Sequence, residues 1–308
     1  MVFSELIAVY LFLGGAAAGS FLCIALIEVR EDITCAVSCG SLASAMRVQC
    51  RNSLYLTRRR VARLVYAMSF VLLACGLGCL LADLGKPQVF YYLFLYPTTS
   101  LVSLGSFALM GFFVCMVISV ADAVLEKSVV FKRVALIAKV VGIPLAVFVM
   151  MYTGLLLKTV IPVYIWQSYW LVALFTLSAL SCGCGVVILC AFFSEGYKGI
   201  ARWSRFFSIA DIVCIVLEAV VAVVYFWTIY NNYGLDPLIP VMFSDLSYMY
   251  WLGFVGCGLV VPLGLEIYAL LMNHHMNRGV LVLLSVMILL GGLCLRLTLV
   301  SAGIHYMC

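Results

Sequence analysis

Eight long apolar stretches occupy most of this 308-residue chain, and they restrict its possible folds more than any other feature. Each is long enough to cross the hydrocarbon core of a bilayer, which takes about 20 apolar residues. Hydrophobic residues make up 66% of the chain and charged residues 10%, whereas about a quarter of a soluble domain is charged. The predicted spans are residues 5–28, 62–83, 101–123, 134–157, 168–193, 206–230, 248–272 and 279–304. This pattern predicts an all-α integral membrane protein with eight transmembrane helices.

The spans leave no room for a soluble domain, because the longest connection between them covers only about residues 29–61. Chemistry on a large substrate would therefore require another polypeptide. The N-terminus lacks a basic region, carries Glu5 and continues into a long apolar run, which is not the pattern of a secretory signal peptide. We interpret this segment as the first span, retained in the mature protein.

Basic residues are concentrated in the connections on one side of the predicted membrane. The odd-numbered connections carry Arg30, Arg47, Arg51, Arg58, Arg59, Arg60, Arg63, Lys127, Lys132, Arg133, Lys198, Arg202, Arg205 and Arg278. The opposite side carries only Lys86 and Lys158. Because cytoplasmic loops are enriched in Lys and Arg, the odd-numbered connections are predicted to be cytoplasmic and both termini to lie outside. Topology and anionic lipid explain the basic clusters without nucleic acid.

Several spans carry ionisable residues well inside the hydrocarbon. Glu218 is predicted near the middle of its span, and Arg296 lies deep in the last span. Lys139, Asp211 and Glu266 lie within other spans. Because charge in lipid is expensive, these five residues are candidates for a proton path. The alternative is structural: Arg296 would neutralise Glu218, and Lys139 would extend its ammonium to the inner surface.

The histidines and cysteines exclude most metal and haem sites. His274 and His275 are adjacent in an inner connection and His305 lies at the C-terminus, so no pair is placed to hold a haem in the membrane. The fourteen cysteines form no C-x-x-C motif, and most lie in spans as small apolar packing residues. We therefore predict no haem and no metal in this protein. A quinone remains compatible, because it needs only a slot, a tyrosine or carboxylate near its oxygens, and an electron acceptor.

A series of short motifs runs along the chain in a particular order. They are Glu5-Leu-Ile-Ala-Val-Tyr10-Leu-Phe-Leu-Gly-Gly15, Asp83-Leu-Gly-Lys-Pro87, Phe90-Tyr91-Tyr92, Pro97-Thr-Thr-Ser100, Ser103-Leu-Gly105-Ser, Tyr152-Thr153-Gly154 and Gly291-Gly292-Leu-Cys-Leu-Arg296. In this order they resemble the NrfD/PsrC family, the quinone-reactive membrane anchors of iron–sulfur molybdoenzymes such as polysulfide reductase. The resemblance covers nearly the whole chain and is strongest in the first four spans.

The resemblance implies a haem-free fold of two four-helix bundles, which we place at residues 1–160 and 161–308. It implies a quinone or menaquinone site near the outer leaflet, in the first bundle. It also implies partners on the outer face of the cytoplasmic membrane: a four-cluster ferredoxin-like iron–sulfur subunit and a molybdopterin catalytic subunit. The function expected is electron and proton exchange between membrane quinone and the iron–sulfur subunit.

Two residues are carried over to the quinone site from the family's motifs. Tyr152 would hydrogen-bond a quinone oxygen, and Asp83 would accept or deliver its proton. Four more residues are assigned to the site: Tyr10, Lys86, Gly14 and Gly15. Lys86 would favour an anionic intermediate or bind the partner subunit, and the two glycines would leave room beside the headgroup.

Two other functions remain open at this stage. A secondary transporter would use the same buried charges to bind a substrate or coupling ion. Pro144 and Pro262, inside two of the spans, are compatible with the broken helices of transporters, but the sequence shows no internal repeat. A structural anchor would hold a catalytic subunit at the membrane without an active quinone site.

Overall fold

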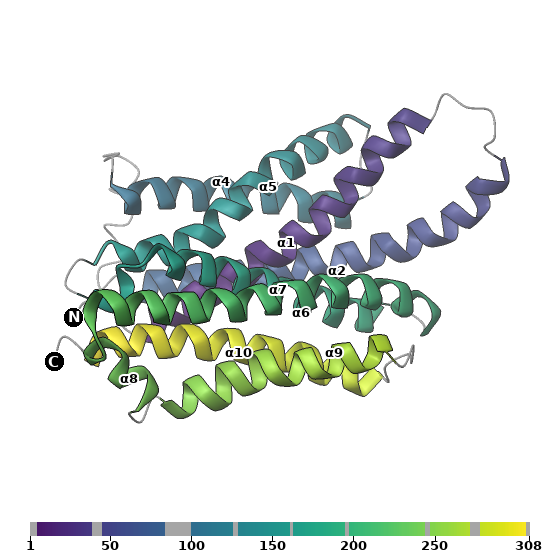
Figure 1. Ribbon diagram of the computed structural model, residues 1–308. Coiled ribbons are helices and arrows are strands. Elements are labelled where there is room, and N and C mark those ends of the chain that lie inside the picture. Colours follow the sequence, from purple (N-terminus) through teal and green to yellow (C-terminus); the bar gives the residue numbers. More distant parts are fainter. Residues whose placement is uncertain are drawn as a thin grey trace.

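The computed structural model describes residues 5–38, 45–83, 100–125, 129–160, 163–194, 197–243, 247–271 and 278–305. Within these residues all regular secondary structure is helical, and eight helical segments are long and apolar enough to cross a membrane (Figure 1). The prediction of eight spans is confirmed, and the observed boundaries differ from the predicted ones by only a few residues. The protein is therefore a multi-pass, all-α membrane protein.

The long helices follow one another along the sequence. They are α1 (Glu5–Ser38), α2 (Ala45–Asp83), α4 (Leu101–Val124), α5 (Val129–Lys158), α6 (Tyr169–Ser194), α7 (Tyr197–Tyr233), the π-helix η4 (Met249–Val260) with its continuation α9 (Val261–Leu271), and α10 (Arg278–His305). Short helices η2 (Tyr164–Trp166), η3 (Asp236–Leu238) and α8 (Ile239–Met242) lie in two of the connections. The start of α1 and the end of α10 lie at the same end of the molecule (Figure 1).

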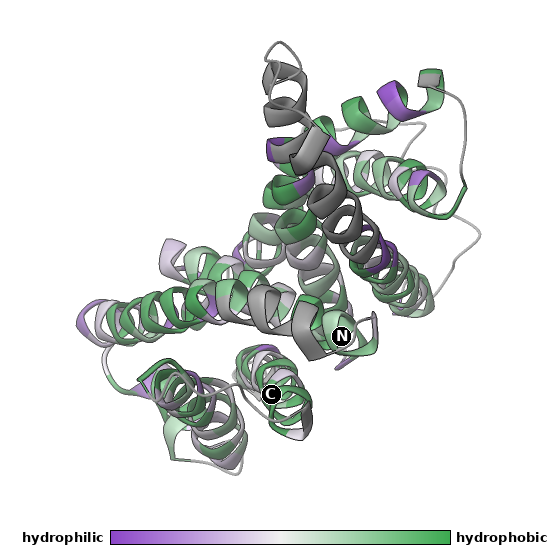
Figure 2. Cartoon of the chain, turned by 90° about the vertical axis from the view of Figure 1, so that its right-hand side faces the viewer, coloured by the Kyte–Doolittle hydropathy of each residue, from purple (hydrophilic) through white to green (hydrophobic). Residues whose placement is uncertain are grey.

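Helices α1 and α6 form the centre of the molecule. In each, 78% of the apolar spanning stretch is buried, against 28–44% in the other six spans. Helix α1 contacts α2, α5, α6 and α10, and α6 contacts α1, α2, α5, α7 and α10. Seen nearly end-on in Figure 2, the helices are mostly hydrophobic around their whole circumference. This is expected of helices that face either lipid or one another.

Glycines allow the two central helices to approach closely. A Cβ atom at Gly19 of α1 would overlap the carbonyl oxygen of Ala179, and one at Gly183 of α6 would overlap the backbone of Gly19. Small residues at such contacts are typical of membrane helix pairs, because packing rather than hydrophobic transfer drives association in lipid. Gly258 of η4 and Gly291 of α10 make a second contact of the same kind.

The structure differs from the sequence-based prediction at two places. Residues 29–61 were expected to form a connection, yet α1 continues to Ser38 and α2 already begins at Ala45. Charged residues exclude these segments from the membrane, but they do not oppose helix formation. The seventh span begins as a π-helix, in which the Val261 amide bonds the carbonyl of Gly256, and Pro262 follows directly. Apolar content along the chain does not distinguish this geometry from an α-helix.

Candidate functional site

Tyr10 of α1 and Tyr152 of α5 lie near the end of the molecule where α1 begins and α5 ends. Their residue exposures are only 2% and 4%, and they are close enough to interact electrostatically. The Tyr152 ring stacks on Phe148, with ring centroids 6.5 Å apart. Within the described residues neither hydroxyl makes a hydrogen bond, although the hydroxyl of a buried tyrosine usually does. Both hydroxyls are thus available to a ligand that carries oxygen atoms.

Small residues from two further helices surround these phenols. A Cβ at Gly105 of α4 would overlap the Tyr152 ring, so this glycine lets the ring lie against the helix backbone. A Cβ at Gly76 of α2 would lie 3.5 Å from the amide nitrogen of Gly14 and 3.7 Å from the Tyr10 ring. Four helices, α1, α2, α4 and α5, therefore meet around the two tyrosines.

The other residues assigned to the quinone site have different surroundings. Gly15 faces away from the phenols, since a Cβ there would lie 3.0 Å from Nη2 of Arg296. Asp83 is the last residue of α2 and is half-buried, and it makes no hydrogen bond with Tyr152. Lys86 lies outside the described residues.

Asp211 and Glu218 occupy one face of α7, as their spacing of seven residues indicates. Both are buried, with exposed fractions of 0% and 3%. Ser181 Oγ donates to Asp211 Oδ1 at 2.6 Å, and Ser178, one turn earlier on α6, interacts with the Glu218 carboxyl. The carboxyl groups therefore face α6 rather than lipid.

Arg296 of α10 is completely buried between two aromatic rings. Its guanidinium carbon lies 5.8 Å from the ring centroid of Phe12 and 5.3 Å from that of Phe175. Its hydrogen-bond acceptors are the Gly292 carbonyl (2.9 Å), Ser178 Oγ (3.3 Å) and the Phe175 carbonyl (3.3 Å). Arg296 and Glu218 form no ion pair within 4.0 Å, and both interact with Ser178. The arginine therefore influences Glu218 electrostatically and through the serine, without direct contact.

Glu266 of α9 is the third buried carboxyl in this half of the protein, with an exposed fraction of 0%. It interacts electrostatically with Asp211 and also interacts with the side chain of Ser208 of α7. Neither carboxylate oxygen of Glu266 has a hydrogen-bond partner within 3.5 Å among the described residues. Buried polar groups are rarely left in this state.

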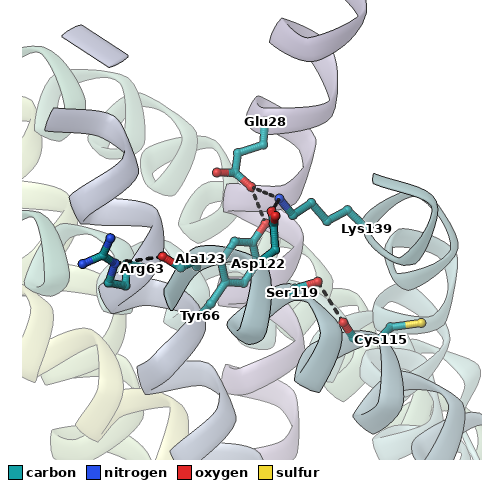
Figure 3. Close-up of polar contacts among 8 residues, drawn as sticks. All are labelled: Glu28, Arg63, Tyr66, Cys115, Ser119, Asp122, Ala123 and Lys139. Carbon is teal, nitrogen blue, oxygen red and sulfur yellow. Dashed lines mark hydrogen bonds and ion pairs between the residues drawn. The ribbon is translucent and has the colours of Figure 1, made fainter. Parts of the chain in front are cut away.

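Lys139 of α5 belongs to a separate ionic cluster (Figure 3). Its Nζ lies 2.8 Å from Asp122 Oδ2 of α4 and 3.0 Å from Glu28 Oε2 of α1. The Tyr66 hydroxyl of α2 donates to the same Glu28 oxygen at 2.8 Å. The lysine is 6% exposed and is neutralised inside the protein, so it does not extend its ammonium to the surface. One cluster thus joins α1, α2, α4 and α5.

The five proton-path candidates therefore divide into two groups. Lys139 lies among the helices that surround the two tyrosines, whereas Asp211, Glu218, Glu266 and Arg296 lie among α6, α7, α9 and α10. The sequence reasoning missed Asp122 and Tyr66 as partners of Lys139. A search for the acid that neutralises a buried lysine would have found Asp122, because it is the only charged residue among residues 101–123.

Comparison with known proteins identifies one family. Residues 1–307 match the family described as polysulphide reductase, NrfD. The protein is 24% identical over 331 residues to the protein NrfD homolog of Haemophilus influenzae, covering 98% of this sequence and 94% of that protein. It is 25% identical over 322 residues to the C chain of polysulfide reductase from Wolinella succinogenes, covering 96% of this sequence and 92% of that protein.

Proposed function

Because this protein belongs to the polysulphide reductase NrfD family, we propose that it is the quinone-reactive membrane subunit of a multisubunit oxidoreductase. In this role it exchanges electrons and protons between membrane quinone or quinol, such as menaquinone, and an extrinsic iron–sulfur subunit. The name of the Wolinella relative, which is one of the chains of a reductase, supports membership in such a complex. The observation that carries the proposal is the pair of buried phenols, Tyr10 and Tyr152, whose hydroxyls lack hydrogen bonds within the described residues.

The surroundings of these phenols suit a flat ring with two oxygen atoms. Tyr152 would donate a hydrogen bond to one quinone oxygen, and Tyr10 is close enough to contact the same headgroup. Gly14 and Gly105 keep side-chain volume away from the two rings. Apolar residues along the helices would accommodate the isoprenoid tail.

Oxidation of one quinol releases two electrons and two protons. Asp83, at the end of α2, would take up protons directly or through water, and the electrons would pass to the nearest cluster of the iron–sulfur partner. Reduction of a quinone would use the same groups in the opposite direction. Lys86 remains a candidate for stabilising negative charge or for binding the partner.

The buried charges would supply a proton path toward the cytoplasm. Glu218, Asp211 and Glu266 form a discontinuous ladder, with Arg296 beside Glu218. Lys139 would take part in proton transfer at the inner end of the group formed by α1, α2, α4 and α5. Such a path requires water between the carboxyl groups, because the described contacts do not connect them directly.

We further propose that residues 1–160 and 161–308 form two four-helix bundles joined along α1 and α6. The contacts of α1 with α2 and α5, and of α6 with α7 and α10, support this division. The basic connections support a topology in which both termini lie on the outer side of the cytoplasmic membrane. The same outer end would bind the ferredoxin-like iron–sulfur subunit and, beyond it, the molybdopterin subunit.

Site-directed variants of the intact complex test the quinone site. Tyr152→Phe and Asp83→Asn are each expected to lower quinol-coupled activity, and Tyr152→Phe should raise the KM for quinol about tenfold, the effect of one lost hydrogen bond of ~1.4 kcal/mol. The matched control is Tyr225→Phe, because the buried Tyr225 hydroxyl instead donates to the Ile165 carbonyl at 2.7 Å. That control should lower stability and leave the quinol KM unchanged.

The same measurements separate the remaining alternatives. Full activity in both the Tyr152 and the Asp83 variant would reject the site. If the complex reacts with quinone in no titration, this protein would instead be a structural anchor that holds the catalytic subunit at the membrane. Ion or solute transport by the isolated protein in liposomes would favour the secondary transporter.

A further inference from the structure

Asp211 and Glu266 form a buried pair of carboxyl groups without a basic partner among the described residues. Both residues have an exposed fraction of 0%, and they interact electrostatically across the contact of α7 with α9. Oδ2 of Asp211 and both carboxylate oxygens of Glu266 lack hydrogen bonds within the same residues. Arg296, a buried cation of α10, interacts with Glu218 and Cys182 instead.

The remaining neighbours do not neutralise the pair. The titratable side chains that interact with it are Cys182 and Cys184 of α6, and Cys214 and Glu218 of α7. None of these carries positive charge in any protonation state. Two adjacent carboxylates in a medium of low dielectric constant cannot both remain ionised, because neither solvent nor a cation offsets their charge.

The hydrogen bonds indicate which member of the pair is neutral. Asp211 accepts a short hydrogen bond from Ser181 at 2.6 Å, and this stabilises its ionised form. Among the described residues Glu266 has no donor within 3.5 Å of its carboxylate oxygens, and its interaction with Ser208 is longer than that. We propose that Glu266 holds a proton at neutral pH and serves, beside an ionised Asp211, as the resting proton store of the inner half of the membrane. The inference rests on the proton path proposed above and identifies where that path holds its proton at rest.

The nature of the stored ion follows from the ligands available. The described residues include no group of three or more His, Cys, Asp or Glu side chains placed to bind a metal ion. Two carboxyl groups and a serine offer few oxygen ligands for a bare cation, whereas one carboxyl group is sufficient for a proton. The proton also neutralises the buried charge with no further ligand.

Infrared spectroscopy of the resting complex in H₂O and D₂O tests the proposal without quinone turnover. Protonated carboxyl groups absorb in a carbonyl-stretch region where carboxylates do not. We expect a deuterium-sensitive band that is lost in Glu266→Gln and shifted in Glu266→Asp. The band should persist in Asp122→Asn, the matched control, because Asp122 is paired with Lys139 in a separate cluster. If Glu266→Gln fails to assemble, the band shift in Glu266→Asp provides the assignment.

Two results would overturn the proposal. The band could survive in Glu266→Gln, or it could vanish when sodium replaces potassium. The last result would identify the stored ion as sodium. Quinol-coupled activity of the same preparations is a separate readout, so a failed quinone site and a failed proton store can be distinguished.

Discussion

The ammonium of Lys139 lies 2.8 Å from Oδ2 of Asp122, and this contact joins the spanning segments of α5 and α4. Glu28 completes the cluster from α1, so one lysine is shared between two carboxylates and its charge balances one of them. The two acids retain 17–19% of their side-chain exposure, which makes the cluster a partly buried ion pair. Its strength therefore depends on both the Coulomb attraction and the remaining access to water.

Replacement of Lys139 should destabilise the helices that carry the proposed quinone site. Lys139→Met removes the ammonium group from Glu28 and Asp122, and we expect a loss of about 2 kcal/mol, less than the roughly 3–5 kcal/mol of a fully buried pair. Thermal unfolding of the purified protein in detergent measures this loss. The double variant Lys139→Met with Asp122→Asn should recover part of it. Equal stability of the single and double variants would show that the ion pair between Lys139 and Asp122 does not stabilise the protein.

Gly183 should be intolerant of any side chain. Gly183→Ala forces α6 away from the backbone of Gly19, and we expect a cost of about 1–3 kcal/mol, typical of overpacking. The expected result is a lower melting temperature and less assembled complex in the membrane. Gly78→Ala on α2 is the control, since a Cβ there meets nothing within 4 Å. Similar yields for both variants would contradict the close approach of α1 and α6.

Gly105 should affect quinone binding more than folding. Gly105→Ala places a methyl group where the Tyr152 ring now lies, and the flexible side chain can move to relieve the overlap. We expect a higher quinol KM with little change in the amount of assembled complex. Gly111→Ala on the same helix is the control, because its Cβ would lie 3.5 Å from Leu145. A normal quinol KM in Gly105→Ala would show that Tyr152 does not contact the quinone.

Arg296 should tolerate neither loss of its charge nor loss of its planar shape. Arg296→Lys keeps a positive charge near Glu218 but cannot reproduce hydrogen bonds from a planar fork, at a cost of about 1–3 kcal/mol. Arg296→Met also removes the charge and should be less stable than Arg296→Lys. Stability measured by denaturation in mixed detergent micelles ranks the variants. If Arg296→Met were more stable than Arg296→Lys, the buried positive charge would not stabilise the protein.

The sequence was sufficient to predict the spans because membrane insertion depends on apolar content summed along a segment. The positions of Tyr10, Tyr152 and the buried charges along their spans also follow from the sequence, since helix rise is constant. The spacing of Asp211 and Glu218 correctly placed them on one face of α7.

The partners of these residues depend on how each helix is rotated and which helix lies beside it, and hydropathy does not encode this. Five charges that looked like one ladder separate into two groups, because α5 directs Lys139 toward Asp122 and Glu28 while α7 directs Asp211 toward α6. Gly14 and Gly15 are neighbours in sequence, but a helix turns about 100° per residue. One therefore lies beside Tyr10 and the other beside Arg296. The sequence by itself determined the membrane spans and their content, and only the packing of the eight spans decided which side chains meet.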